Sequence, residues 1–140
     1  MIDCDAGDFT HKVHDNVIKS FFVDLEKGTL KMETTWEDKE VTTIEFTGLL
    51  AHKFEHVIST SIIFGLYQAT IESFIDEEKD YLSESLKYGF PSTKASTLEK
   101  LKHELEAGQY KIFWIDSVLG LCGYIIAKDI NIVIQQMNVL

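Results

Sequence analysis

The sequence predicts an α+β fold, in which two helices cover an antiparallel sheet of five to seven strands. Three stretches of the chain predict this fold. Residues 17–47 alternate polar and apolar side chains in three short runs, which is typical of a meander of half-buried strands. Residues 71–88 repeat apolar side chains at the period of a helix. Residues 110–127 are rich in aromatic and β-branched side chains on either side of Gly120, which is typical of a hairpin.

The meander is the part of the chain around which the rest is organised. Its strands are expected at 17–25, 29–37 and 40–47, and Gly28 can supply the positive φ that the first tight turn needs. Alternation places one set of side chains on the inner face of the second and third strands: Leu30, Met32, Thr34, Trp36, Thr42, Ile44 and Phe46. A sheet with one polar and one apolar face needs a cover on its apolar side.

One ambiguous segment and one clear strand follow the meander. Residues 48–58 are compatible with a short helix or an irregular crossing. Residues 62–67 form a short apolar run rich in β-branched and aromatic side chains, so we expect a buried fourth strand there, with Gly65 at a bulge. Thr70 then stands where it can cap a helix over 71–88.

A second helix and a C-terminal group of strands follow the loop at 89–95, which contains the single proline. Ser96 and Glu99 have the spacing of a capping box, and Gly108 stands where a glycine often ends a helix. A hairpin over 110–127 and a last strand over 130–134 complete the pattern. We expect the last strand to continue the pairing of the hairpin. These strands either extend the first sheet or form a second small layer.

Length and composition indicate one domain over residues 1–140, with an irregular acidic lead-in over 1–13. The chain is 45% hydrophobic and has one proline, which is ordinary for a globular protein and argues against long linkers. It contains no apolar run of about 18 residues and no signal-peptide pattern, so we expect a cytoplasmic protein without a membrane span. Two cysteines, Cys4 and Cys122, are too few for a disulfide framework and are expected to be reduced.

The net charge restricts the classes of partner. The formal charge is -10 at pH 7 and the pI is near 4.8. A chain this acidic repels phosphate groups, so we do not expect direct binding to nucleic acid or to an anionic membrane. Basic proteins are the partners that it attracts. The alternative is that the acidity serves solubility alone.

Acidic residues are concentrated on the outer face of the helix predicted over 71–88. Six acids stand against two lysines in this stretch, which leaves a charge of -4. Glu72, Asp76, Asp80 and Glu84 stand four residues apart and form one row of like charges. Like charges four residues apart destabilise a helix by roughly 0.2–0.5 kcal/mol per pair, so this row has a cost in stability. The candidate partner-binding residues are Glu72, Asp76, Glu77, Asp80 and Glu84. The alternative interpretation is a plain solvated helix face.

Residues 52–56 match the pattern His-x-x-Glu-His. On a helix, His52 and His56 would share a face and could bind zinc, with Glu55 as general base. The pattern arises easily by chance in a chain with 5 His and 23 acids, so we assign no metal and no cofactor. The chain also lacks a Gly-rich phosphate loop, a Gly-x-Ser-x-Gly elbow and a Cys-x-x-Cys pair, so no catalytic residue is assigned.

An aromatic group stands near the C-terminal hairpin. Its members are Tyr110, Phe113, Trp114 and Tyr124. We expect these side chains to pack in the core and at an edge rather than to form a ligand cage.

The order of elements resembles small proteins of Gram-positive bacteria, several of which are immunity partners of secreted polymorphic toxins. The matching features are HDNVI at 14–18 leading into a strand, Asp24, Leu30, TIEFTG at 43–48, an acidic helix, and a C-terminal hairpin with YIIAKDI at 124–130. The resemblance implies an antitoxin that binds a toxin domain in the cytoplasm of the producing cell and blocks its active site. Such toxin domains are often nucleases, whose basic clefts complement an acidic inhibitor.

The sequence therefore favours a small acidic cytosolic binding protein of the immunity type, which neutralises a basic toxin domain. Two alternatives stay open. One is a metal-dependent hydrolase that uses His52, Glu55 and His56. The other is a homo-oligomeric structural domain joined through an exposed aromatic edge such as Trp114.

Overall fold

The computed structural model describes residues 7–137 and shows one antiparallel sheet of eight strands with four α-helices. The strands are β1 Val17–Asp24, β2 Thr29–Trp36, β3 Glu40–Thr47, β4 Ala51–Glu55, β5 Ile62–Ala69, β6 Lys111–Leu119, β7 Cys122–Ala127 and β8 Asp129–Gln136. The helices are α1 Thr10–Val13, α2 Ile71–Glu77, α3 Lys79–Ser85 and α4 Leu98–Ala107, with a 3-10 turn, η2, at Leu86–Tyr88. The α+β class is confirmed, and the prediction of five to seven strands and two helices is wrong.

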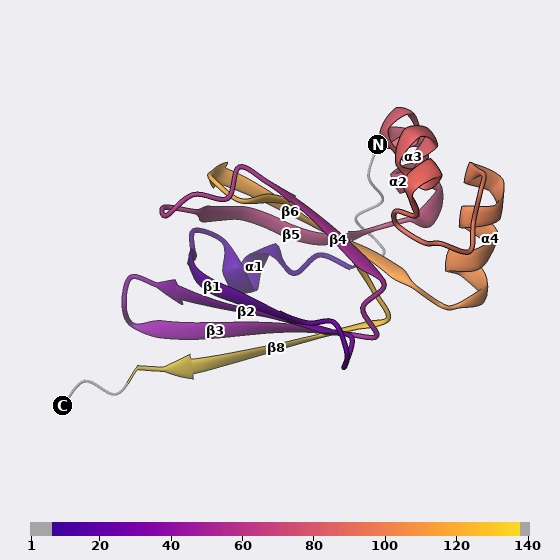
Figure 1. Cartoon of the computed structure of the whole chain (residues 1–140). Coiled ribbons are helices and arrows are strands. Elements are labelled where there is room, and N and C mark those ends of the chain that lie inside the picture. Colours follow the sequence, from indigo (N-terminus) through magenta and orange to yellow (C-terminus); the bar gives the residue numbers. More distant parts are fainter. Residues whose placement is uncertain (1–6, 138–140) are drawn as a thin grey trace.

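The sheet folds over into two layers, with strand order β4-β7-β6-β5-β1-β2-β3-β8 (Figure 1). The layers join at the short pairing of β1 with β5, where Val17 stands opposite Ile62. The chain crosses between the layers again at 48–50 and at Lys128, whose N–H donates to the carbonyl of Thr47 at 2.9 Å. α1 lies between the layers where they are apart, and its Val13 is fully buried. The two halves of one sheet therefore cover each other.

The main core fills the space between the two layers. Met32 and Phe46 from the meander are fully buried and belong to the same cluster as Phe113 and Ile125 from the hairpin. The rings of Phe46 and Phe113 lie 5.3 Å apart. The inward positions predicted for the meander are confirmed except at the end of β2, where Trp36 is 37% exposed. The meander is covered mainly by the other half of the sheet and not by the helices that follow β5.

A run of buried hydrogen bonds lies in the main core beside the junction of β1 and β5. Asn16 donates from Nδ2 to Oγ1 of Thr34 at 2.9 Å, and that hydroxyl donates to the carbonyl of Thr42, also at 2.9 Å. All three residues are at least 98% buried. Buried polar groups are stable when they are hydrogen-bonded, so a threonine is acceptable at the inward position 34.

The longer helices form a second core on the other face of the hairpin. Phe74 of α2, Leu82 of α3 and Leu105 of α4 are fully buried there with Tyr124 and Ile126 of β7. Side chains alternate along β7, so Ile125 faces the main core while its two neighbours face the helices. In Figure 1 the helices gather at one end of the sheet.

The single helix predicted over 71–88 is divided. Its start is as expected, because Oγ1 of Thr70 accepts a hydrogen bond from the N–H of Ser73 at 3.1 Å. α2 ends at Glu78, which has a φ of -102° and a ψ of 11°, and α3 begins at the next residue. The chain then leaves η2 through Gly89 at a φ of 87°.

Three further expectations are corrected. The ambiguous segment 48–58 crosses between the layers at 48–50, but its middle forms the edge strand β4, which pairs with β7 and was not expected. The last strand, β8, pairs with β3 and not with the hairpin. The second helix is capped by Thr97, one residue after the expected Ser96, and the left-handed residue at its end is Gln109 rather than Gly108. Gly108 is needed because a Cβ there would lie 2.5 Å from the Tyr110 ring.

Candidate functional site: the acidic surface of α2 and α3

All five acids singled out in the sequence are exposed on α2 and α3. They are Glu72, Asp76, Glu77, Asp80 and Glu84, and together they define what we call the acidic surface. Glu84 forms an ion pair with Lys87 at 3.1 Å. The side chains of the other four form no hydrogen bond or ion pair with any residue between 7 and 137. Their charge is therefore available to solvent and to a partner.

The acids face solvent because the opposite side of each helix is buried. Phe74 on α2 and Leu82 on α3 are fully buried, and Leu86 on η2 is 7% exposed. These positions recur at helical spacing, so the side chains between them must point outward. The division at Glu78 interrupts the regular row, since Asp76 and Asp80 now belong to different helices.

The sixth acid of this stretch, Glu78, is neutralised from the sheet. Nζ of Lys53 on β4 lies 3.4 Å from a carboxylate oxygen of Glu78 and 3.4 Å from one of Glu55. Burial works against the charged form of Lys53, but the two carboxylates outweigh it, and the pKa of Lys53 is raised. The same ammonium lies 3.8 Å from the centroid of the Tyr81 ring. This contact ties the edge of the sheet to the start of α3.

Two tyrosines border the acidic surface. Tyr81 is 44% exposed and Tyr88, at the end of η2, is 84% exposed. Tyr81 lies at the margin of the packed face of α3, with its ring 6.1 Å from that of Phe90. Sequence reasoning missed both as site residues. Tyrosine is enriched at protein interfaces, so the acids and the tyrosines together suit a protein partner.

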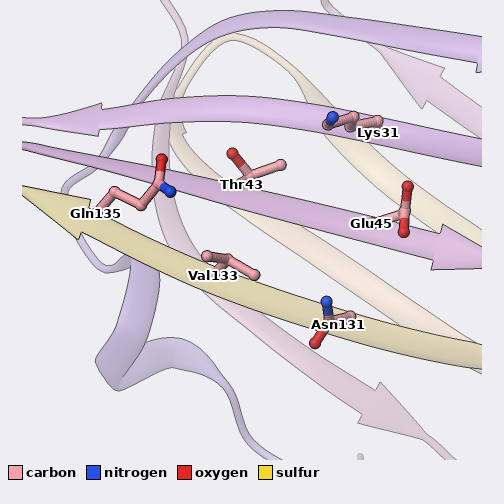
Figure 2. A pocket seen from close by; sticks show the side chains of 6 residues that line it. All are labelled: Lys31, Thr43, Glu45, Asn131, Val133 and Gln135. Carbon is pink, nitrogen blue, oxygen red and sulfur yellow. The ribbon is translucent and has the colours of Figure 1, made fainter.

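The hollow on the outer face of β2, β3 and β8 is shallow and polar (Figure 2). Its volume is about 260 Å³, and its lining residues are Lys31, Thr43, Glu45, Asn131, Val133 and Gln135. Lys31 and Glu45 stand opposite each other on paired strands. The hollow brings together no pair of groups suited to acid–base or nucleophilic chemistry, so it does not indicate a catalytic site.

The His-x-x-Glu-His segment does not form the helix that zinc chelation would need. His52 and Glu55 lie on strand β4, where positions three apart face opposite sides of the sheet. Glu55 pairs with Lys53, and Nδ1 of His56 lies 3.9 Å from Sγ of Cys122. Among residues 7–137, no group of three or more His, Cys, Asp or Glu side chains is arranged to hold a metal ion. Cys4 lies outside the described residues.

The aromatic group near the hairpin is divided between the two cores. Phe113 faces the main core, whereas Trp114 and Tyr124 face the helices with ring centroids 5.2 Å apart. Tyr124 is 1% exposed, and burial raises its pKa. The expectation of core packing is confirmed for these residues. Trp114 lies on β6, between β5 and β7, so it does not form an exposed edge of the sheet.

No helix in the described part of the chain combines the length and the apolar character needed to cross a membrane. Comparison with protein-family models, with curated proteins and with solved structures found no match to this chain.

Proposed function

We propose that this chain is a small binding protein of the immunity type, which acts in the cytoplasm and neutralises a basic toxin domain by covering its active site. The single observation that supports the proposal is the acidic surface, with exposed carboxylates on two consecutive helices and Tyr88 at their end. The partner side of this interface would be a basic cleft, of the kind that nucleases use to hold phosphate.

The acids are better explained by a partner than by the fold. Two like-charge pairs stand four residues apart within one helix, Glu72 with Asp76 on α2 and Asp80 with Glu84 on α3. Each such pair destabilises its helix by a few tenths of a kcal/mol. Lys53 supplies a counter-charge to Glu78. No described residue forms an ion pair with Glu72, Asp76, Glu77 or Asp80. A basic partner would supply the missing counter-charge and would be steered toward the surface before contact.

Charge reversal on the acidic surface tests the proposal. The tagged wild-type chain would first be used to capture a stoichiometric basic partner from cells that produce this chain. The association rate of the purified pair would then be measured by surface plasmon resonance. We expect the triple variant Asp76→Lys, Asp80→Lys, Glu84→Lys to lower the association rate by at least about tenfold at low salt. Added salt should slow the wild-type association and have little effect on the variant.

A matched variant controls for the change in total charge. Glu26, Glu33 and Glu37 are exposed acids of the meander, away from α2 and α3, and reversing all three to lysine changes the net charge equally. This variant should keep most of the wild-type association rate. Equal losses in the two triple variants, or unchanged binding in both, would contradict the assignment of the partner site to α2 and α3.

A further inference from the structure

The sheet has two edges, and they differ in how they are protected against strand pairing. β4 is five residues long and carries Lys53 and Glu55, which suit the charged, short edge that proteins use to prevent association. β8 is eight residues long and is paired along its whole length with β3. Residues 130–137 contain no charged residue and no proline. The chain as a whole is 26% charged, so the β8 edge is less charged than the rest of the chain. Because it lacks the charges and prolines that block strand pairing, this edge is open to a further strand.

The direction of the free backbone groups on β8 follows from one hydrogen bond. The N–H of Met137 donates to the carbonyl of Lys39 at 2.8 Å, so the backbone of Met137 faces β3. Antiparallel ladders alternate between residues that face the partner strand and residues that face away. The backbone groups of four residues therefore point to the open side: Ile130, Ile132, Ile134 and Gln136. In the part of the chain that the structure describes, no strand pairs with this side.

We propose that the open edge of β8 binds the same edge of a second copy of this chain, in an antiparallel two-fold pairing. The neutral strand argues for this occupant, because a partner recognised by its positive charge would find no carboxylate between 130 and 137. Two chains of charge -10 repel each other, and this repulsion is smallest when the two copies meet through a neutral strand.

The sequence of β8 complements itself when the two-fold axis passes at Val133. Ile132 of each copy then stands opposite Ile134 of the other on the inner face, and Asn131 stands opposite Gln135 on the outer face. The only charged residue of the strand, Asp129, faces the neutral Met137 and not another carboxylate. Val133, Ile134 and Met137 are 44%, 44% and 40% exposed in the single chain, so the pairing also buries apolar surface.

The pairing extends the outer surface of the sheet and leaves the acidic surface open. Asn131, Val133 and Gln135 line the polar hollow, which would continue across the two-fold axis into its copy (Figure 2). The helices α2, α3 and α4 lie at the opposite end of the molecule from the β8 arrow (Figure 1). The dimer would thus present two acidic surfaces, which would raise the avidity for a multivalent partner. The inference stands independently of the proposed function.

Sedimentation velocity on the purified full chain tests the proposal. We expect a concentration-dependent dimer of twice the 16.0 kDa chain mass. Added salt should strengthen it, because salt screens the repulsion between two acidic copies. This response is opposite in sign to that of binding a basic partner, so the two proposals fail separately. A wild-type chain that stays monomeric at millimolar concentration in high salt would overturn the inference.

Two variants locate the contact on β8. Val133→Lys places two ammonium groups at the two-fold axis and should weaken the dimer by at least about tenfold. Val118→Lys makes the same change on β6, where Val118 is 60% exposed, and should leave the dimer intact. Ile134→Pro removes an open-side N–H without removing a bond to β3, and it should also abolish pairing. A dimer that persists in both β8 variants would overturn the assignment.

Amide hydrogen exchange gives a readout that does not depend on the total mass. In the wild-type dimer, the amides of Ile130, Ile132, Ile134 and Gln136 should be protected. In Val133→Lys the same amides should exchange rapidly, while the odd-numbered amides of β8 stay protected by β3. Rapid exchange of the even-numbered amides in a wild-type dimer would place the dimer contact elsewhere and overturn the inference.

Discussion

The ammonium of Lys53 lies 3.4 Å from the carboxylate of Glu78 and joins the edge strand β4 to the start of α3. Both side chains are largely buried, with 22% and 20% of their surfaces exposed. The aromatic face of Tyr81 completes the site of the cation. A contact between an edge strand and a helix in this position holds the helical layer against the sheet and so helps to fix the orientation of the acidic surface.

Removing the ammonium group of Lys53 should destabilise the protein. Lys53→Met leaves Glu78 partly buried without its counter-charge and removes the contact with Tyr81, so we expect a loss of about 1–2 kcal/mol in the free energy of unfolding. Urea denaturation would measure it. Glu78→Gln in the Lys53→Met background should recover part of the loss, whereas Glu55→Gln alone should change stability by less than about 0.5 kcal/mol because Glu55 is 55% exposed. Equal effects of Lys53→Met in the wild-type chain and in the Glu78→Gln variant would show that the ion pair contributes nothing.

Gly123 allows β7 to pair closely with β4. Its φ is 149°, and a Cβ built there would lie 1.9 Å from the carbonyl oxygen of Lys53. Gly123→Ala should therefore lower the free energy of unfolding by about 3 kcal/mol, through backbone strain and displacement of β4. Thermal unfolding followed by circular dichroism would measure the change.

Gly28→Ala is the matched control for that variant. Gly28 also has a positive φ, 69°, but a Cβ there would lie no closer than 3.6 Å to its nearest neighbour, the N of Leu49. Only the left-handed conformation is then penalised, and the expected loss is about 1 kcal/mol. A smaller loss for Gly123→Ala than for Gly28→Ala would contradict the close approach of β7 and β4.

His52 should make the stability depend on pH. Burial lowers its pKa in the folded chain, while the unfolded value is about 6.5. The unfolded chain then binds more protons in the window below pH 6.5, so the stabilising effect of neutral His52 is lost as the pH falls through that window. His52→Leu should gain stability relative to the wild type as the pH is lowered from about 7 to 5.

Denaturation curves at several pH values check this expectation. A constant difference between His52→Leu and the wild type across the range would show that His52 does not contribute to the pH dependence.

Much of the local structure could be predicted from the sequence, because it depends on neighbours along the chain. The alternation in 17–47 gives β1, β2 and β3, together with the buried face of β2 and β3. Thr70 caps α2 as its position predicts, and Gly120 turns the hairpin at a φ of 84°. The five acids of the candidate site were predicted to be exposed for the same reason, since helical periodicity alone assigns them to the outer face.

The tertiary structure decided which elements meet. β4 has no clear period, so only its ladder with β7 makes it a strand. β8 follows the hairpin directly in the sequence, yet the chain crosses at Lys128 to the other layer, where β8 pairs with β3. This crossing is possible because the two layers close over a common core. A long-range contact of this kind also pairs Glu78 with Lys53, so this acid is not part of the acidic surface. Periodicity determines which face of an element is apolar, but the choice of partner depends on pairing across the sheet, which no local pattern contains.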